Sequence, residues 1–360
     1  MFNFIPIEYY TPIWYNTMLI IILFAFIKLQ TKGYIIYNPK KKEYASLLLL
    51  LIVSLYMGLR PISGIFIDMK TYNYRFEAFA GGREVNFDRD VLWALFEKFS
   101  SGIMTGEFFF FICALLYVVP LYKASKNWLG KDKYFLFLML VCSFSFWNYG
   151  VNGIRNGVAT SFFVLGLSYY KKRKLKWGLL ILSYFIHGSM MIPIAAFVLT
   201  LFYKNPKHYL LGWLFVIPIS VILGGLIEPY VMSLGIGGDR ASYLTMDVND
   251  SSFSSTGFRW DFLLYSASAV FAGYYFIIKK NFNDKLYVQL FNIYVTANAF
   301  WILVIRASFS NRFAYLSWFL MAVIIFYPFF KKQFFKKQQK VLAYTILLYF
   351  GFTYVMFLMF

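Results

Sequence analysis

One stretch decides the membrane topology: residues 177–203 read WGLLILSYFIHGSMMIPIAAFVLTLFY. As a single helix this apolar run would be about 40 Å long and would cross a bilayer once. A single crossing would place Lys204 and Lys207 on the side opposite to the lysines of residues 171–176. The economical alternative is a run that enters the membrane, turns near His187-Gly188-Ser189 and returns as two short helices.

The hairpin gives three residues a local role. Gly188 supplies the turn, because it has no side chain to restrict its backbone. Pro193 lies in the first turn of the second helix, where its missing N–H costs little. His187 then lies at the tip of the hairpin, near the outer interface of the membrane.

Composition sets the class of protein. Apolar residues make up 60% of the chain, aromatic residues 23% and charged residues only 14%, which is typical of a polytopic membrane protein. We expect an all-α protein, a single transmembrane domain over residues 1–360, with about ten full transmembrane helices and about twelve membrane helices once the hairpin is included. The expected spans are 13–29, 45–59, 108–122, 134–147, 153–170, 210–227, 262–278, 286–304, 313–330 and 341–360.

Lysine and arginine are distributed differently along the chain. Of the 35 basic residues, 24 fall into six clusters in which Arg173 is the one arginine. Basic clusters mark the cytoplasmic side of a membrane protein, so we expect these clusters inside and both chain ends outside. The remaining eleven basic residues, nine of them arginines, then face outward. The six clusters lie at 28–42, 123–133, 171–176, 204–207, 279–285 and 331–340.

Two longer loops are expected on the outer face, at residues 60–107 and 228–259. The first contains an amphipathic stretch, residues 91–99, which we expect to lie flat on the membrane surface. Asp88 and Asp90 precede it as candidate N-caps. Their D-x-D spacing also occurs in metal sites of nucleotide-sugar enzymes, but capping explains it more simply.

The outward arginines point to an anionic substrate. The planar guanidinium binds phosphate through two parallel hydrogen bonds and stays charged at any relevant pH. The alternative is that these side chains reach to lipid phosphates without a specific function. Arg155 and Arg306 fit that alternative less well, because they lie at helix boundaries where a charge is costly.

Two residues are candidates for proton transfer. His187 has an ordinary pKa of about 6.5 and lies at the tip of the expected hairpin, although a histidine in an apolar run is more often a core residue. Asp68 is a candidate general base, an arginine partner or a helix cap. The sequence contains no zinc pattern and no P-loop, and its lysines are dispersed between helices rather than arranged for nucleic-acid binding.

Three motifs occur in order along the chain: Gly58-Leu59-Arg60 with Asp68 and Tyr72, then Asn152-Gly153-Ile154-Arg155-Asn156 with Phe185-Ile186-His187-Gly188-Ser189, and finally Asn311-Arg312-Phe313 with Tyr315. They resemble the motifs of a known family, the EpsG-type branch of the Wzy polysaccharide (O-antigen) polymerases. Their order, spacing and side of the membrane carry the resemblance. Asn156 stands where glutamine is more usual, and Pro61-Ile62-Ser63 also departs from the pattern.

The resemblance implies a GT-C-like glycosyltransferase in the bacterial cytoplasmic (inner) membrane with its active site facing outward. It would transfer a growing glycan from undecaprenyl pyrophosphate to a second lipid-linked repeat unit, without a metal or other cofactor. A flippase and a chain-length regulator would be partners, and nucleic acid would not. Within this scheme the donor pyrophosphate is assigned to Arg155, Arg306 and Arg312, and the base to His187 or Asp68. Acceptor lipid or glycan is assigned to Arg60 and Arg75, with Tyr72, Arg240 and Tyr315 as further binding residues.

Three other functions fit part of the pattern. A lipid-linked oligosaccharide flippase would meet the same anion, but it should carry basic residues deep in the membrane. A membrane O-acyltransferase has a similar size, yet it would need catalytic residues early in the chain, where Glu8 is the one acidic residue of Asn3–Pro12. An O-antigen ligase would share the arginine and histidine chemistry and differ only in its acceptor.

Overall fold

The computed structural model describes residues 4–31, 39–87, 90–233, 257–307 and 310–359. These residues form helices joined by loops and contain no strand. Seven helical segments among them are long and apolar enough to cross a membrane. The chain is therefore an all-helical, multi-pass membrane protein, as its composition predicts. It divides into two compact units, one formed by residues 1–187 and 329–360 and the other by residues 188–328.

The first unit holds ten of the α-helices in the described residues. They are α1 (Tyr10–Thr31), α2 (Pro39–Gly58), α3 (Ile67–Ala80), α4 (Val91–Ser101), α5 (Gly106–Leu129), α6 (Lys133–Val141), α7 (Phe144–Val151), α8 (Ile154–Ser168), α9 (Arg173–Ile186) and α17 (Gln338–Met359).

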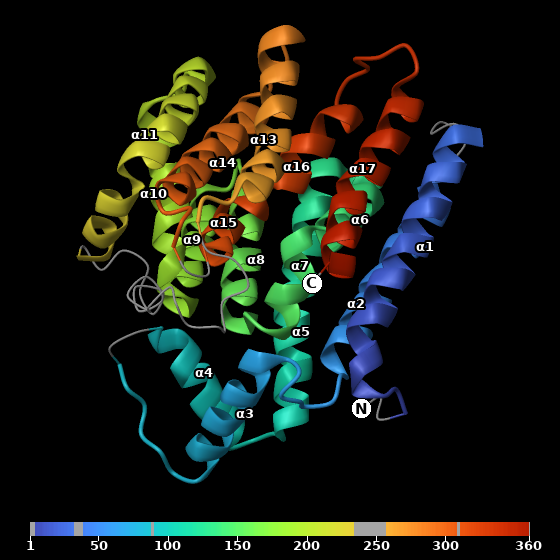
Figure 1. The fold of residues 1–360 in the computed structure, drawn as a ribbon. Coiled ribbons are helices and arrows are strands. Elements are labelled where there is room, and N and C mark those ends of the chain that lie inside the picture. The colour runs from blue at the N-terminus through green and yellow to red at the C-terminus, as the bar shows by residue number, and fades with distance from the viewer. Residues whose placement is uncertain (1–3, 32–38, 88–89, 234–256, 308–309, 360) are drawn as a thin grey trace. The chain divides into compact units, whose positions relative to one another are not determined.

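Helix α5 lies at the centre of the first unit, packed against α2, α6 and α8, while α8 packs in turn against α9. The two terminal helices, α1 and α17, pack against each other. Aromatic stacking fills the contact between α1 and α7, where the rings of Trp14 and Trp147 lie 4.8 Å apart. Helices α3 and α4 lie together at one end of the unit, beside the start of α5 (Figure 1). These packings bring the starts of α4 and α8 and the end of α9 into one region.

The second unit is built around α14 (Lys285–Leu303), which packs against α10 (Met191–Phe202), α11 (Pro206–Ser233) and α15 (Asn311–Trp318). A buried polar network fixes its centre. Asn298 of α14 accepts a hydrogen bond from the Trp213 indole at 2.8 Å and donates to Ser266 at 3.1 Å and Ser317 at 3.0 Å. Interhelical bonds of this kind satisfy polar groups that would be costly to leave unpaired. The remaining α-helices of the unit are α13 (Trp260–Tyr274) and α16 (Met321–Phe326).

Two of the runs expected as single spans are interrupted. Residues 134–147 are divided between α6 and α7, because the backbone at Ser143 is extended and its hydroxyl donates back to the carbonyl of Leu140. Residues 313–330 are divided between α15, α16 and a 3₁₀ turn, η7 (Tyr327–Phe330). That run is almost entirely buried. It is still one of the seven segments long and apolar enough to cross a membrane, and irregular backbone is tolerated in a span that is buried in protein.

The stretch 177–203 is also interrupted at the place that the sequence predicts. Helix α9 ends at Ile186, a 3₁₀ turn (η4) covers Gly188–Met190, and α10 begins at Met191. The return of the second helix to the cytoplasmic side stays a prediction, as does the description of residues 1–360 as a single domain.

Candidate functional site

Three charged or titratable side chains from separate elements meet in the first unit. Asp90 immediately precedes α4, Arg155 is the second residue of α8, and His187 directly follows α9. The Oδ2 atom of Asp90 lies 2.9 Å from Nη1 of Arg155 and 3.2 Å from Nδ1 of His187. All three side chains are largely buried, with 8% of Asp90, 16% of Arg155 and 8% of His187 exposed. We call these three residues the Asp90 cluster.

The backbone at Asp90 explains how its carboxylate reaches this position. Asp90 has φ 47° and ψ 44°, a left-handed conformation that is unusual for a residue with a side chain. Its side chain makes no capping hydrogen bond to α4. The expectation that Asp90 caps this helix is therefore wrong, because the carboxylate is drawn to two basic groups of other helices. Asp88, the other candidate cap, lies outside the described residues.

The positions of Arg155 and His187 follow from how their helices begin and end. An ideal Cβ built at Gly157 would lie 2.6 Å from the carbonyl oxygen of Tyr149, so only glycine allows α8 to start this close to α7. Helix α9 ends at His187, which donates its backbone N–H to the carbonyl of Ser183 and has an extended backbone (φ −153°, ψ 118°). The extended backbone places the His187 side chain in the Asp90 cluster.

Helix α3 brings two more predicted residues to the edge of the cluster. The Tyr72 hydroxyl interacts with the backbone N–H of Arg155, and its ring packs edge to face against Trp93 at 5.9 Å. Burial raises the pKa of Tyr72 to about 12, and the nearby Asp68 carboxylate also raises it. Asp68 lies in the first turn of α3, where a negative charge suits the helix dipole. Both residues thus lie in the region of Arg155.

A buried acidic residue that the sequence did not suggest lies in α4. Glu97 is fully buried, and its carboxylate lies 2.8 Å from the guanidinium of Arg75 on α3. Burial raises the pKa of Glu97 above its ordinary value, while the positive charges of Arg75 and Arg155 oppose the shift. Arg75 is thus paired within the protein. The expected apolar stripe of α4 is not its buried face, since Leu95 and Phe99 are exposed.

Arg60 is buried rather than presented to the surface. Only 2% of it is exposed, and its guanidinium lies 5.5 Å from the Phe66 ring and 5.9 Å from the Phe110 ring while donating to the carbonyl of Met57. Its contact with acceptor lipid or glycan stays a prediction, and such a contact would require these rings to move.

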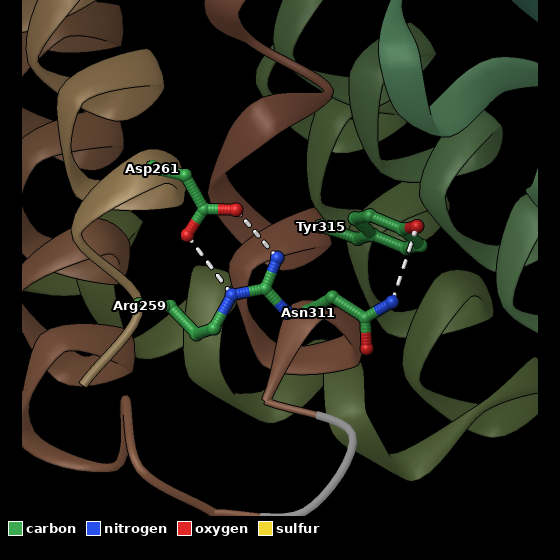
Figure 2. Close-up of polar contacts among 4 residues, drawn as sticks. All are labelled: Arg259, Asp261, Asn311 and Tyr315. Carbon is green, nitrogen blue, oxygen red and sulfur yellow. Dashed lines mark hydrogen bonds and ion pairs between the residues drawn. The ribbon is translucent and has the colours of Figure 1, made fainter. Parts of the chain in front are cut away.

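The second unit contains the other predicted arginines. Arg306 donates to the carbonyl of Val221 at 2.9 Å, and Arg312 lies in the first turn of α15. In the same turn the Asn311 amide donates to the Tyr315 hydroxyl at 3.4 Å (Figure 2). Arg240 lies outside the described residues.

A pair that the sequence did not single out is also present in the second unit. Arg259 forms a two-pronged ion pair with Asp261, through Nε to Oδ1 at 2.9 Å and Nη2 to Oδ2 at 2.6 Å (Figure 2). The short spacing of the two residues at the start of α13 accounts for it.

The Asp90 cluster combines a fixed cation, a fixed carboxylate and an imidazole. Such a set can bind an anionic group and transfer a proton. Across the described ranges, which omit Asp88, no group of three or more His, Cys, Asp or Glu side chains is arranged to hold a metal ion.

Fold and cluster together define a multi-pass membrane protein with a charged site at the ends of its helices. Residues 43–360 match the model of the EpsG family, so the chain belongs to that family. It is a membrane protein of polysaccharide biosynthesis. No curated protein and no solved structure matches the chain significantly.

Proposed function

We propose that this protein is a glycosyltransferase that polymerises undecaprenyl-pyrophosphate-linked repeat units at the outer face of the bacterial cytoplasmic membrane. Membership of the EpsG family and the multi-pass helical fold support this proposal. O-antigen, capsule and exopolysaccharide are all products of such a reaction. A chain-length regulator and a flippase are proposed as its partners.

The observation that carries the proposal is the meeting of Arg155 with His187. The sequence assigned the first to pyrophosphate and the second to proton transfer, and both contact the same oxygen atom of Asp90. Polymerisation needs these two functions close together, because one substrate loses a pyrophosphate while the other loses a hydroxyl proton. Arg306 and Arg312 are proposed as further pyrophosphate ligands, although they belong to the other unit.

Aromatic side chains in the first unit suit the sugar part of the substrate. Tyr74 on α3 and Phe87 in the loop before α4 are 69% and 64% exposed. Exposed rings of this kind can stack against the apolar faces of sugars. The exposed Leu95 and Phe99 on α4 fit a helix that lies in the membrane interface, where a lipid-linked substrate would approach sideways.

The proposal assigns the Asp90 cluster to the outer side of the membrane. The lysine clusters support this orientation, because arginine-bearing segments separate all of them except 171–176 and 204–207, between which the expected hairpin lies. A cysteine at Phe87, an exposed position in the loop before α4, that reacts with a membrane-impermeant reagent in intact cells would agree with it. Labelling that occurs only after the cytoplasm is opened would contradict it.

A deletion strain tests the function directly. Loss of a polymerase should leave a single repeat unit on the surface, and the wild-type gene should restore the long glycan. Repeat units that accumulate in the cytoplasm would instead indicate a flippase. A long glycan that lacks a modification would indicate an acyltransferase, and a long glycan held on its lipid carrier would indicate a ligase.

A further inference from the structure

We propose that Asp90 is a positioning residue for His187, which it holds as the Nδ1–H tautomer so that Nε2 receives the proton of the acceptor hydroxyl. This inference rests on the proposed function and adds a residue to it. Asp90 Oδ2 and His187 Nδ1 are 3.2 Å apart, an ion-pair contact that is not aligned as a hydrogen bond. Contacts of this kind in a site without substrate often shorten when the substrate binds.

The acceptor hydroxyl oxygen forms a bond to the anomeric carbon of the donor sugar, and the bond from that carbon to the pyrophosphate oxygen breaks. The pyrophosphate leaves with the bonding electron pair, and the hydroxyl proton passes to His187 Nε2. The resulting imidazolium, held at Nδ1 by Asp90, later releases its proton to water.

The charges around His187 explain why a carboxylate is needed there. Arg155 contacts the same Asp90 oxygen as the imidazole, so the fixed positive charge of Arg155 opposes protonation of His187. Asp90 lies between the two and offsets that effect. The other titratable groups in this region are Tyr72 and Asp68 on α3 and Glu97 on α4, which interact with one another or with Arg155.

The strained backbone of Asp90 is an independent observation. Aspartate adopts a left-handed conformation more readily than most residues with a side chain, but the conformation is still uncommon for it. Such conformations persist where surrounding contacts hold them, and they gather at functional sites. A carboxylate that only capped α4 would need no such conformation, because an N-cap residue usually has an extended backbone. The φ of 47° instead directs the side chain to Arg155 and His187.

The small number of histidines makes the tautomer measurable. The chain has two, and the other, His208, is exposed and stacks on the Tyr203 ring at 5.5 Å. In an H208Q background, full-length protein labelled with ¹⁵N in the histidine ring and reconstituted in lipid nanodiscs reports on His187 alone. We expect the ¹⁵N shifts of a proton on Nδ1 at neutral pH. A proton on Nε2 instead would overturn the inference.

Variants extend the test to the reaction. In Asp90→Asn the amide can donate to Nδ1, so we expect the opposite tautomer and a turnover number lowered by about 10²–10⁴-fold. Asp90→Glu should restore part of the Nδ1–H tautomer and part of the turnover number. The matched control is Asp261→Asn, which removes the carboxylate of the Arg259 pair in the other unit and should leave the His187 spectrum unchanged.

The outcomes separate this inference from the proposed function. If wild-type protein forms no polymer from lipid-linked repeat units, the proposed function fails, while the tautomer still decides whether Asp90 orients His187. If wild type polymerises and Asp90→Asn keeps both its tautomer and its turnover, Asp90 is not a positioning residue. A rise in KM with an unchanged tautomer would show that Asp90 acts through Arg155, and it would also overturn the inference.

Discussion

The Glu97 carboxylate of α4 lies 2.8 Å from the Arg75 guanidinium of α3, and Glu97 is fully buried while 30% of the Arg75 side chain is exposed. Because one partner keeps contact with solvent, the pair does not fully offset the desolvation of the other. The raised pKa of Glu97 expresses this imbalance.

Glu97→Gln should therefore stabilise the protein at neutral pH. The folded pKa of Glu97 lies above its unfolded value, so the stability of wild type is greatest below the unfolded pKa and falls as pH rises through the folded pKa. Glutamine resembles the protonated form at every pH. We expect equal melting temperatures near pH 4 and a variant that is more stable by about 1 kcal/mol, or about 2–4 °C, at pH 8.

Thermal unfolding in detergent across this pH range checks the prediction. Glu77→Gln on α3 is the control, because Glu77 is exposed and bonded to Asn73. A higher melting temperature for wild type than for Glu97→Gln at pH 8 would show that the Glu97–Arg75 pair is net stabilising.

Replacing the arginine of α8 by lysine should remove activity although the charge is kept. Arg155→Lys loses the planar fork that grips phosphate, and we expect polymer formation to fall by at least about 100-fold. Arg312→Lys in α15 should behave alike. The control is Arg173→Lys, an exposed arginine among the lysines of the 171–176 cluster, which should be as active as wild type. Polymer of normal length from both Arg155→Lys and Arg312→Lys would contradict the assignment of these arginines to the pyrophosphate.

Loss of the imidazole should separate turnover from binding. His187→Ala is expected to lower the turnover number by about 10²–10⁴-fold while the affinity for the lipid-linked donor stays within about threefold. Fluorescence binding and single-turnover assays measure the two quantities, with His208→Ala as control. If Asp68→Asn instead had the larger effect on turnover, Asp68 would be the base.

Gly157, at the start of α8, should affect both stability and activity although it lies outside the proposed substrate contacts. Gly157→Ala places a methyl group 2.6 Å from the Tyr149 carbonyl oxygen, so α8 must shift and Arg155 with it. We expect lower stability and at least about a tenfold loss of activity, because small misplacements of a site are costly. Gly178→Ala on α9 meets nothing within 4 Å and should stabilise its helix by about 0.5–1 kcal/mol. Equal behaviour of the two variants would contradict this account of α8.

Two residues of the candidate site could be predicted from the sequence, because a polar or charged side chain is costly inside an apolar segment. Arg155 and His187 stood out because each is a polar residue within or beside an apolar run, and both lie in the Asp90 cluster. The interruption at 187–189 was predicted for a similar reason, since the lysines on either side did not permit one crossing. Such inferences need only the membrane and the local pattern.

Other features depended on packing that no local pattern encodes. The local pattern predicts a cap at Asp90, because capping is decided within one helix, whereas its actual partners lie 65 and 97 positions further along the chain. No local pattern distinguishes Glu97, because a glutamate in an amphipathic helix usually faces water. The breaks within 134–147 and 313–330 leave no signal in apolar composition, which does not report where a buried helix changes to irregular backbone.

The Arg155–Asp90 pair also bears on how inhibitors of this protein would act. Under the proposed assignment, a pyrophosphate mimic that binds Nη1 of Arg155 competes with a carboxylate that belongs to the same chain, and a tethered group of this kind acts at an effective concentration of about millimolar or above. Such a compound would therefore bind the resting protein less tightly than it would bind a protein without this carboxylate. Asp90→Asn, although catalytically impaired, would retain the lipid-linked substrate more tightly than wild type does, which makes it the better bait for capturing that substrate from membranes.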